Sequence, residues 1–266
     1  MEKQGGADML AIIQLIFSVI SGILVGFSLG LIGGGGSILA IPLLIYFVGY
    51  HHPHLAIGTT ALAVGVNAYL NLIPHALKRN VKYREGVLFT IPGIIGVLAG
   101  SELGLLTPGN FLLFFFGFLM IAIAVYMLIR KSGQDDKSQG KLSYKKLLPV
   151  GLIVGFASGY FGIGGGFLIV PGLLFGGGLN ITQAVGTSLI SVGTFGVTTA
   201  IRYAFSGELN IILSAFFILG GIAGGWAGAR IANRLPKRIL TEIFAAIVII
   251  VAIYIIIENV SVVYHL

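Results

Sequence analysis

Two glycine-rich segments are the residues of this 266-residue chain whose types and spacing best suit the binding of an ion. The first reads Gly-Gly-Gly-Gly-Ser over 33–37, and the second reads Gly-Ile-Gly-Gly-Gly over 162–166. Because glycine is costly inside a helix and adopts backbone angles closed to other residues, we expect each segment to interrupt a helix. New helices would start near Ser37 and Phe167. The first N–H groups of a helix are unpaired and carry the positive end of its dipole, which suits an anion.

The alternative is that these glycines only let helices pack closely, as we expect for the evenly spaced stripes Gly96-xxx-Gly100-xxx-Gly104 and Gly220-xxx-Gly224-xxx-Gly228. Consecutive glycines exceed what a packing stripe needs, so the ligand interpretation is favoured for the two segments. The predicted substrate-binding residues in them are Gly33, Gly34, Gly35, Gly36, Ser37, Gly162, Gly164, Gly165 and Gly166.

Polar side chains within the apolar sequence are the next candidates for the substrate site. Thr59 and Thr60, and likewise Thr187 and Ser188, lie early in the predicted helix that follows each glycine segment. A single hydroxyl more often bonds to its own helix. Asn67, Asn71 and His75 are spaced four residues apart and share one helix face. Polar groups inside a membrane usually face a cavity.

His75 is a candidate for carrying a proton coupled to transport. It lies three residues before Lys78, which favours a position at the membrane interface instead. Arg202 is the one basic residue outside the N-terminal tail and the basic loops described below. It either attracts anions at the outer mouth or extends to the lipid headgroups, and Glu102 is expected to be an interfacial anchor.

Other motifs do not point to catalysis. Gly26-Phe-Ser-Leu-Gly30 matches a hydrolase nucleophile turn, but it lies in an apolar helix and its copy has Ala157 at the serine position. The adjacent histidines at 51, 52 and 54 lack carboxylates, and we interpret them as a polar loop. We therefore expect no catalytic residue, no metal and no cofactor, and the chain is not predicted to be an enzyme.

The elements that position these residues are predicted to be membrane helices. The sequence is 56% hydrophobic and 9% charged, far less charged than a soluble domain. Continuous apolar runs predict an all-α polytopic membrane protein with about eight to ten membrane segments, of which the glycine-rich ones are broken or re-entrant. The runs lie at about 10–32, 35–50, 55–77, 86–106, 110–129, 147–161, 163–178, 182–204, 209–232 and 238–258.

An internal duplication sets the organisation of the chain. Gly26, Gly30, Gly33 and Pro42 recur 129 residues later, and Ala-Ile-Gly-Thr-Thr at 56–60 matches Ala-Val-Gly-Thr-Ser at 184–188 with an offset of 128. We expect an N-terminal membrane repeat at 1–131, a linker at 132–146 and a C-terminal membrane repeat at 147–266.

The distribution of charge predicts how the two halves are oriented. Fourteen of the 16 Lys and Arg residues fall at 78–84, 130–146 and 230–238. An odd number of crossings per half puts all three loops on the cytoplasmic side, which makes the halves inverted repeats. We expect a multi-pass protein of the inner (cytoplasmic) membrane with a cytoplasmic linker. Its expected partners are the lipid bilayer and a small anionic substrate but no nucleic acid, and a homodimer is left open.

The duplicated glycine segment with its following proline, and the later Ala-x-Gly-Thr-[Thr/Ser] element, resemble the sulfite exporter TauE/SafE family of anion permeases over roughly 10–258. The resemblance implies a secondary transporter that exports sulfite, organosulfonates or related small sulfur-containing anions. It places the substrate at the two glycine segments, with Thr59, Thr60, Thr187 and Ser188 nearby. The alternatives are a passive anion channel and a permease for another small oxyanion or carboxylate.

Overall fold

The computed structural model describes residues 2–129, 143–164, 166–231 and 237–264, and these residues are helical, with no strand among them. The predicted all-α class is therefore confirmed. The elements are α1 (Glu2–Ile32), η1 (Gly33–Leu39), α2 (Ala40–Pro42), η2 (Leu43–Phe47), α3 (Pro53–Leu77), α4 (Tyr83–Leu106), α5 (Gly109–Ile129), α6 (Tyr144–Phe161), α7 (Gly166–Gly177), α8 (Ile181–Phe205), α9 (Ile211–Ile231) and α10 (Lys237–Tyr264).

Seven helices in the described part of the chain are long and apolar enough to cross a membrane, and two apolar helices, Gly36–Phe47 and Gly166–Gly177, are shorter. The seven spans lie in α1, α3, α4, α5, α8, α9 and α10. Large apolar side chains on these helices are exposed, as expected for a surface that faces lipid. The linker predicted at 132–146 lies mostly outside the described residues, and α6 begins at Tyr144.

Local sequence explains where the helices begin. Pro53 stands at the first turn of α3, where its missing N–H costs nothing. Asn180 caps α8: its side chain accepts from the Gln183 N–H at 2.9 Å, and the Gln183 side chain accepts from the Asn180 N–H. Gly207, with a φ of +76°, makes the turn that follows α8.

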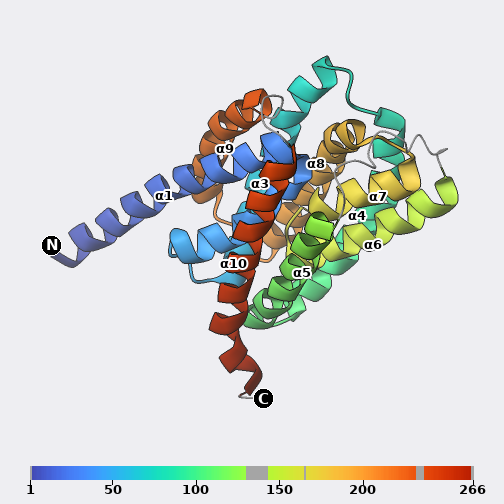
Figure 1. Cartoon of the computed structure of the whole chain (residues 1–266). Coiled ribbons are helices and arrows are strands. Elements are labelled where there is room, and N and C mark those ends of the chain that lie inside the picture. Colours follow the sequence, from blue (N-terminus) through green and yellow to red (C-terminus); the bar gives the residue numbers. More distant parts are fainter. Residues whose placement is uncertain (1, 130–142, 165, 232–236, 265–266) are drawn as a thin grey trace.

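Helices from the two halves of the sequence pack against each other. In Figure 1, α1 runs beside α9 on one side of the molecule and α6 beside α4 on the other, with α3 and α8 between them. The remaining long helices, α5 and α10, pack together. The first helix of each half therefore lies on a later helix of the other half.

Glycines make both of these helix pairs very close. A methyl group added at Gly26 would overlap the carbonyl of Gly221 on α9, and one added at Gly155 would overlap the carbonyl of Gly93 on α4. Glycines of the two predicted packing stripes line the partner helices of these pairs. On α4, Gly96 and Gly100 contact the backbone of α6. On α9, Gly220, Gly224 and Gly228 contact the backbone of α1. Their predicted role in helix packing is confirmed.

The contacts recur in pairs that differ by the offsets of the sequence duplication. Gly26 on Gly221 corresponds to Gly155 on Gly93, and the α3–α9 contact corresponds to the α8–α4 contact. Such pairing is what a duplicated chain would show if its two copies were related by a twofold axis. The orientation of the copies relative to a membrane stays a prediction.

We predict that Gly224→Leu lowers the melting temperature of the detergent-solubilised protein strongly, because the new side chain would meet the carbonyl of Ile23. Overpacking of this kind costs about 1–3 kcal/mol. The neighbouring Ala223→Leu is the matched control, since Ala223 is exposed on the same helix. Equal melting temperatures for the two variants, measured by fluorescence-detected thermal unfolding, would contradict the close contact of α1 with α9.

Candidate functional site

The second glycine segment breaks the chain between α6 and α7, as predicted. Gly162 follows α6 with a φ of +69°, and its N–H donates to the carbonyl of Ser158. Gly164 has a φ of +66°, and α7 starts at Gly166, one residue before the predicted restart. Both positive φ values fall in the left-handed region, where a side chain would strain the backbone.

This break lies at the centre of the molecule, against the α3–α8 pair. A methyl group at Gly162 would overlap Ile57 of α3. One added at Gly164 would lie 3.4 Å from the Cγ1 atoms of both Val64 on α3 and Val192 on α8. These two valines occupy matching positions in the duplicated halves, 128 residues apart. Gly164 therefore lies where corresponding faces of the two copies meet.

The first glycine segment forms the tight helical turn η1 at the end of α1. From there an apolar helix continues to Phe47. The regular α-helix is therefore interrupted at the predicted place, but by a tight helical turn and not by non-helical backbone. Gly36 packs on the backbone of Leu29, and Ser37 is fully buried. For Gly33, Gly34 and Gly35 only the backbone is described, and Gly165 lies outside the described residues.

The elements that hold or follow the two glycine segments are neighbours. η1 contacts α7, the helix that follows the second break, and both η1 and α7 contact α8. Because α7 begins at Gly166, its N-terminal turn and the positive end of the helix dipole lie beside the break. Chemically, such an arrangement suits a small anion held by backbone donors.

The hydroxyl groups of Thr59 and Thr187 have structural partners. Thr187 Oγ1 accepts from the N–H of Lys82 at 2.9 Å, and Thr59 Oγ1 accepts from the N–H of Asn210 at 3.0 Å. Both donors lie in the loops before α4 and α9, at matching positions of the duplication. Each threonine therefore ties a loop of the other half to the helix on which it lies.

The other two predicted hydroxyls bond to their own helices. Thr60 Oγ1 donates to the carbonyl of Ala56 at 2.7 Å, and Ser188 Oγ donates to the carbonyl of Val185 at 2.8 Å. These are the intrahelical bonds that a single Thr or Ser favours in an apolar helix. Thr60 and Ser188 are fully buried, so their role near a substrate stays a prediction.

The Asn67–Asn71–His75 stripe faces α9 and α8. Asn67 is 0% exposed and lies against Gly221, while Asn71 is 1% exposed and lies against Gly225. The Asn71 Nδ2 donates to the Asn67 carbonyl at 2.9 Å. Within the described residues, both amide atoms of Asn67, the Oδ1 of Asn71 and the Nδ1 of His75 are buried without a protein partner.

Buried polar atoms without partners are rare, because each costs its full desolvation free energy. The matching stripe on α8 is Phe195, Thr199 and Tyr203, and Phe195 packs on Gly93 as Asn67 packs on Gly221. The two copies therefore share geometry but differ in chemistry. The amide side chains lie on α3, while Thr199 and Tyr203 of α8 carry buried hydroxyl groups that also have no protein partner.

Sequence reasoning missed the pairing of Arg202 with Glu102. Arg202 Nε donates to Glu102 Oε2 at 2.6 Å, and its Nη1 donates to Ser206 Oγ at 2.7 Å. The pair joins the ends of α8 and α4 at the surface. The only signal in the sequence was that both residues were expected at outer helix ends, which does not say that they are neighbours.

Comparisons with known proteins agree with the fold. The model of the "Sulfite exporter TauE/SafE" family matches residues 18–255. A "Probable membrane transporter protein" of Xylella fastidiosa (strain 9a5c) is 46% identical over 248 residues, covering 91% of this chain and 95% of the relative. The "Probable membrane transporter protein YunE" of Bacillus subtilis is 26% identical, covering 79% of this chain and 86% of that relative.

We predict that Thr59→Val and Thr187→Val each lower the free energy of unfolding by about 1 kcal/mol, because a backbone N–H loses its partner. Thr60→Val is the control, since the carbonyls of Ala56 and Ile57 keep their helical bonds. Thermal unfolding in detergent measures the difference. A Thr60→Val effect as large as that of the other two would contradict the structural role of the loop contacts.

Proposed function

Because the chain belongs to the sulfite exporter TauE/SafE family and is a multi-pass membrane transporter, we propose that it is a secondary transporter that exports small sulfur-containing anions. Sulfite and organosulfonates are the proposed substrates, and the cytoplasmic membrane is the proposed location. The linker would face the cytoplasm, as the basic loops predict.

The observation that supports this proposal is that η1, which holds the first glycine segment, contacts α7, the helix that follows the second break. Gly164 lies between Val64 and Val192. Non-helical backbone within a membrane persists only where protein or a polar cavity satisfies it. A substrate anion would accept hydrogen bonds from the backbone N–H groups at this break.

Backbone donors suit a carrier of a small oxyanion. Hydrogen bonds to a charged oxygen are stronger than neutral ones, and a site shielded from water strengthens them further. Gly162 and Gly164 let α3 and α8 approach the break closely, because a methyl group at Gly162 would overlap Ile57 and one at Gly164 would touch Val64 and Val192. A site of this kind recognises compact anions by size and by the number of oxygen acceptors.

The paired contacts support an alternating-access mechanism. In inverted repeats, the two copies exchange conformations around one central site, so that it opens to each side in turn. The loop contacts of Thr59 and Thr187 are matching contacts of this kind, one from each copy. The inverted relation itself remains a prediction from the basic loops, which an odd number of crossings in each half would keep on one side.

The polar stripe on α3 is proposed to line the path to the site. Asn67 and Asn71 carry buried amide atoms without protein partners, so a passing anion or its water would supply partners. The aligned Phe195 has no polar atom, which favours the α3 stripe at this position, while Thr199 and Tyr203 of α8 also carry unpartnered hydroxyl groups. His75, at the end of this stripe, would exchange a coupled proton near the interface.

We predict that Gly164→Ala reduces saturable sulfite flux into proteoliposomes by at least tenfold. Its new methyl group would stand between Val64 and Val192, at the proposed site, and would strain a residue with positive φ. Flux is measured with a sulfite-sensitive dye inside the vesicles, at equal protein reconstitution.

The matched control is Gly207→Ala. Gly207 has the same class of backbone angle, with a φ of +76°, but nothing lies within 4 Å of the methyl group that would be added. Backbone strain alone would affect both variants equally. Retained flux in Gly164→Ala, or equal loss in both, would place the substrate elsewhere.

A carrier and a passive channel differ in how substrate on one side of the membrane affects the entry of substrate from the other side. We predict that unlabelled sulfite on one side of the vesicle membrane accelerates the entry of labelled sulfite from the other, because a carrier returns loaded faster than empty. Sulfate and acetate added on that side test the alternative of another oxyanion or a carboxylate. Currents that rise linearly with voltage, without counterflow, would instead identify a channel.

A further inference from the structure

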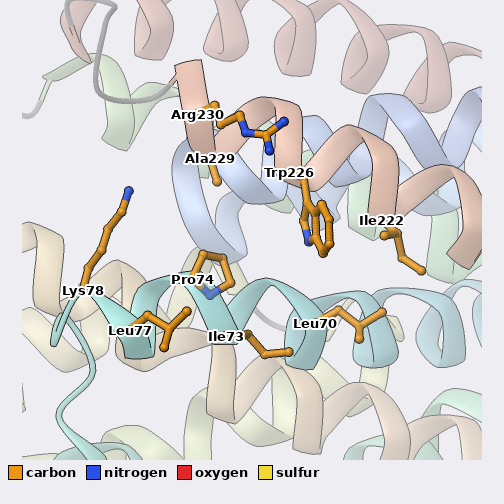
Figure 2. A pocket seen from close by; sticks show the side chains of 9 residues that line it. All are labelled: Leu70, Ile73, Pro74, Leu77, Lys78, Ile222, Trp226, Ala229 and Arg230. Carbon is orange, nitrogen blue, oxygen red and sulfur yellow. The ribbon is translucent and has the colours of Figure 1, made fainter.

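A cavity of about 350 Å³ lies between α3 and α9, and none of the described residues that line it is a glycine. Figure 2 shows α3 along one wall and α9 along the other, with Trp226 standing between them. Most of the lining is aliphatic or aromatic, and it includes Leu70, Ile73, Leu77, Ile222 and Trp226. Trp226, Ile73 and Leu77 are exposed, so the cavity opens to the surrounding membrane as a groove.

Two cations lie at one end of this groove. Lys78 ends α3 and Arg230 lies in the last turn of α9, and both side chains line the cavity. Among the residues that the structure describes, neither has a salt-bridge partner. The groove thus combines a long apolar wall with two positive charges at its end, the pattern of an anionic amphiphile.

The other copy of the duplication provides an internal comparison. The residues that match Pro74, Lys78 and Arg230 with the offset of 128 are Arg202, Ser206 and Glu102. There, Arg202 bonds to both Glu102 and Ser206, and the ion pair joins α8 to α4. In the α3–α9 groove, Arg230 takes the place of the anionic Glu102, and Pro74 takes the place of Arg202. The α3–α9 groove therefore has no acidic residue at the position that pairs with a cation between α8 and α4.

We propose that the α3–α9 groove binds an anionic phospholipid, whose phosphate lies between Lys78 and Arg230 and whose acyl chain lies along Leu70, Ile73 and Ile222. Both cations belong to loops predicted on the cytoplasmic side, where the anionic lipids of the membrane lie. Trp226 is of the residue type that favours the interface. A small hydrated anion would bind to the two cations but would make no contact with the apolar wall, whereas a phospholipid would contact both.

The experiment measures the melting temperature of the full chain in an uncharged detergent. Phosphatidylglycerol is titrated against phosphatidylcholine with the same acyl chains, and against sn-glycerol 3-phosphate as an anion without chains. We expect phosphatidylglycerol to stabilise the wild type and the other two to have little effect. In Arg230→Glu, the apparent affinity for phosphatidylglycerol should fall by at least about fivefold.

Arg230→Glu replaces one of the two cations proposed to hold the phosphate, and Lys78→Glu replaces the other. Both variants should therefore lose affinity, and agreement between them excludes a local folding defect in one. The matched control is the double variant Lys145→Gln, Lys146→Gln, which lowers the net charge by the same amount at the exposed start of α6. It should keep the affinity of the wild type.

Three results would overturn the proposal. Equal stabilisation by phosphatidylcholine would remove the role of charge, and equal stabilisation by glycerol phosphate would identify a site for free anions. An equal loss in the α6 control would show an effect of overall charge alone. Disulfide formation between two copies carrying Ile73→Cys in liposomes would show instead that a second copy covers the groove. None of these outcomes bears on sulfite flux, so the proposal fails or holds independently of the proposed function.

Discussion

Inside a bilayer, every backbone N–H and C=O group must find a partner within the protein, and this chain departs from regular α-helix at two glycine segments, by a tight helical turn at η1 and by a break after α6. The arrangement of the other elements follows from that constraint. Close glycine contacts bring α1 onto α9 and α6 onto α4, which encloses both segments with protein. Thr59 and Thr187 provide partners for the N–H groups of Asn210 and Lys82 in two loops. The proposed anion would accept from backbone N–H groups at the break after α6.

Features set by local backbone chemistry were predictable from the sequence. The end of α6 at Phe161 follows from the glycines after it, and the packing stripes follow from glycine at every fourth position. The class of the fold follows from long apolar runs. In each case the deciding interaction is between near neighbours in the chain or between the chain and the solvent, so composition and spacing are sufficient.

Features set by pairing of distant residues were not predictable. Hydropathy does not show that α1 lies on α9 rather than on a helix of its own half. Arg202 and Glu102 are 100 residues apart, and each alone is compatible with an interfacial anchor. From the sequence alone, the Thr59 hydroxyl was more simply expected to bond to its own helix, yet it accepts from the backbone N–H of Asn210. The geometry that makes η1 and α7 neighbours also depends on such tertiary contacts.

The duplication has diverged in chemistry while keeping its geometry. Asn67 corresponds to Phe195 and Arg230 to Glu102, so one side of the molecule is polar and basic where the other is apolar or neutralised. The most direct test of the central claim is the thermal stability of the detergent-solubilised protein with sulfite, thiosulfate, sulfate, sulfoacetate and simple carboxylates. Ligand bound to the folded state raises stability by mass action. We predict that sulfite or an organosulfonate raises the melting temperature of the wild type but not of Gly164→Ala. An equal rise in both, or no rise with any anion, would contradict an anion site at the glycine break.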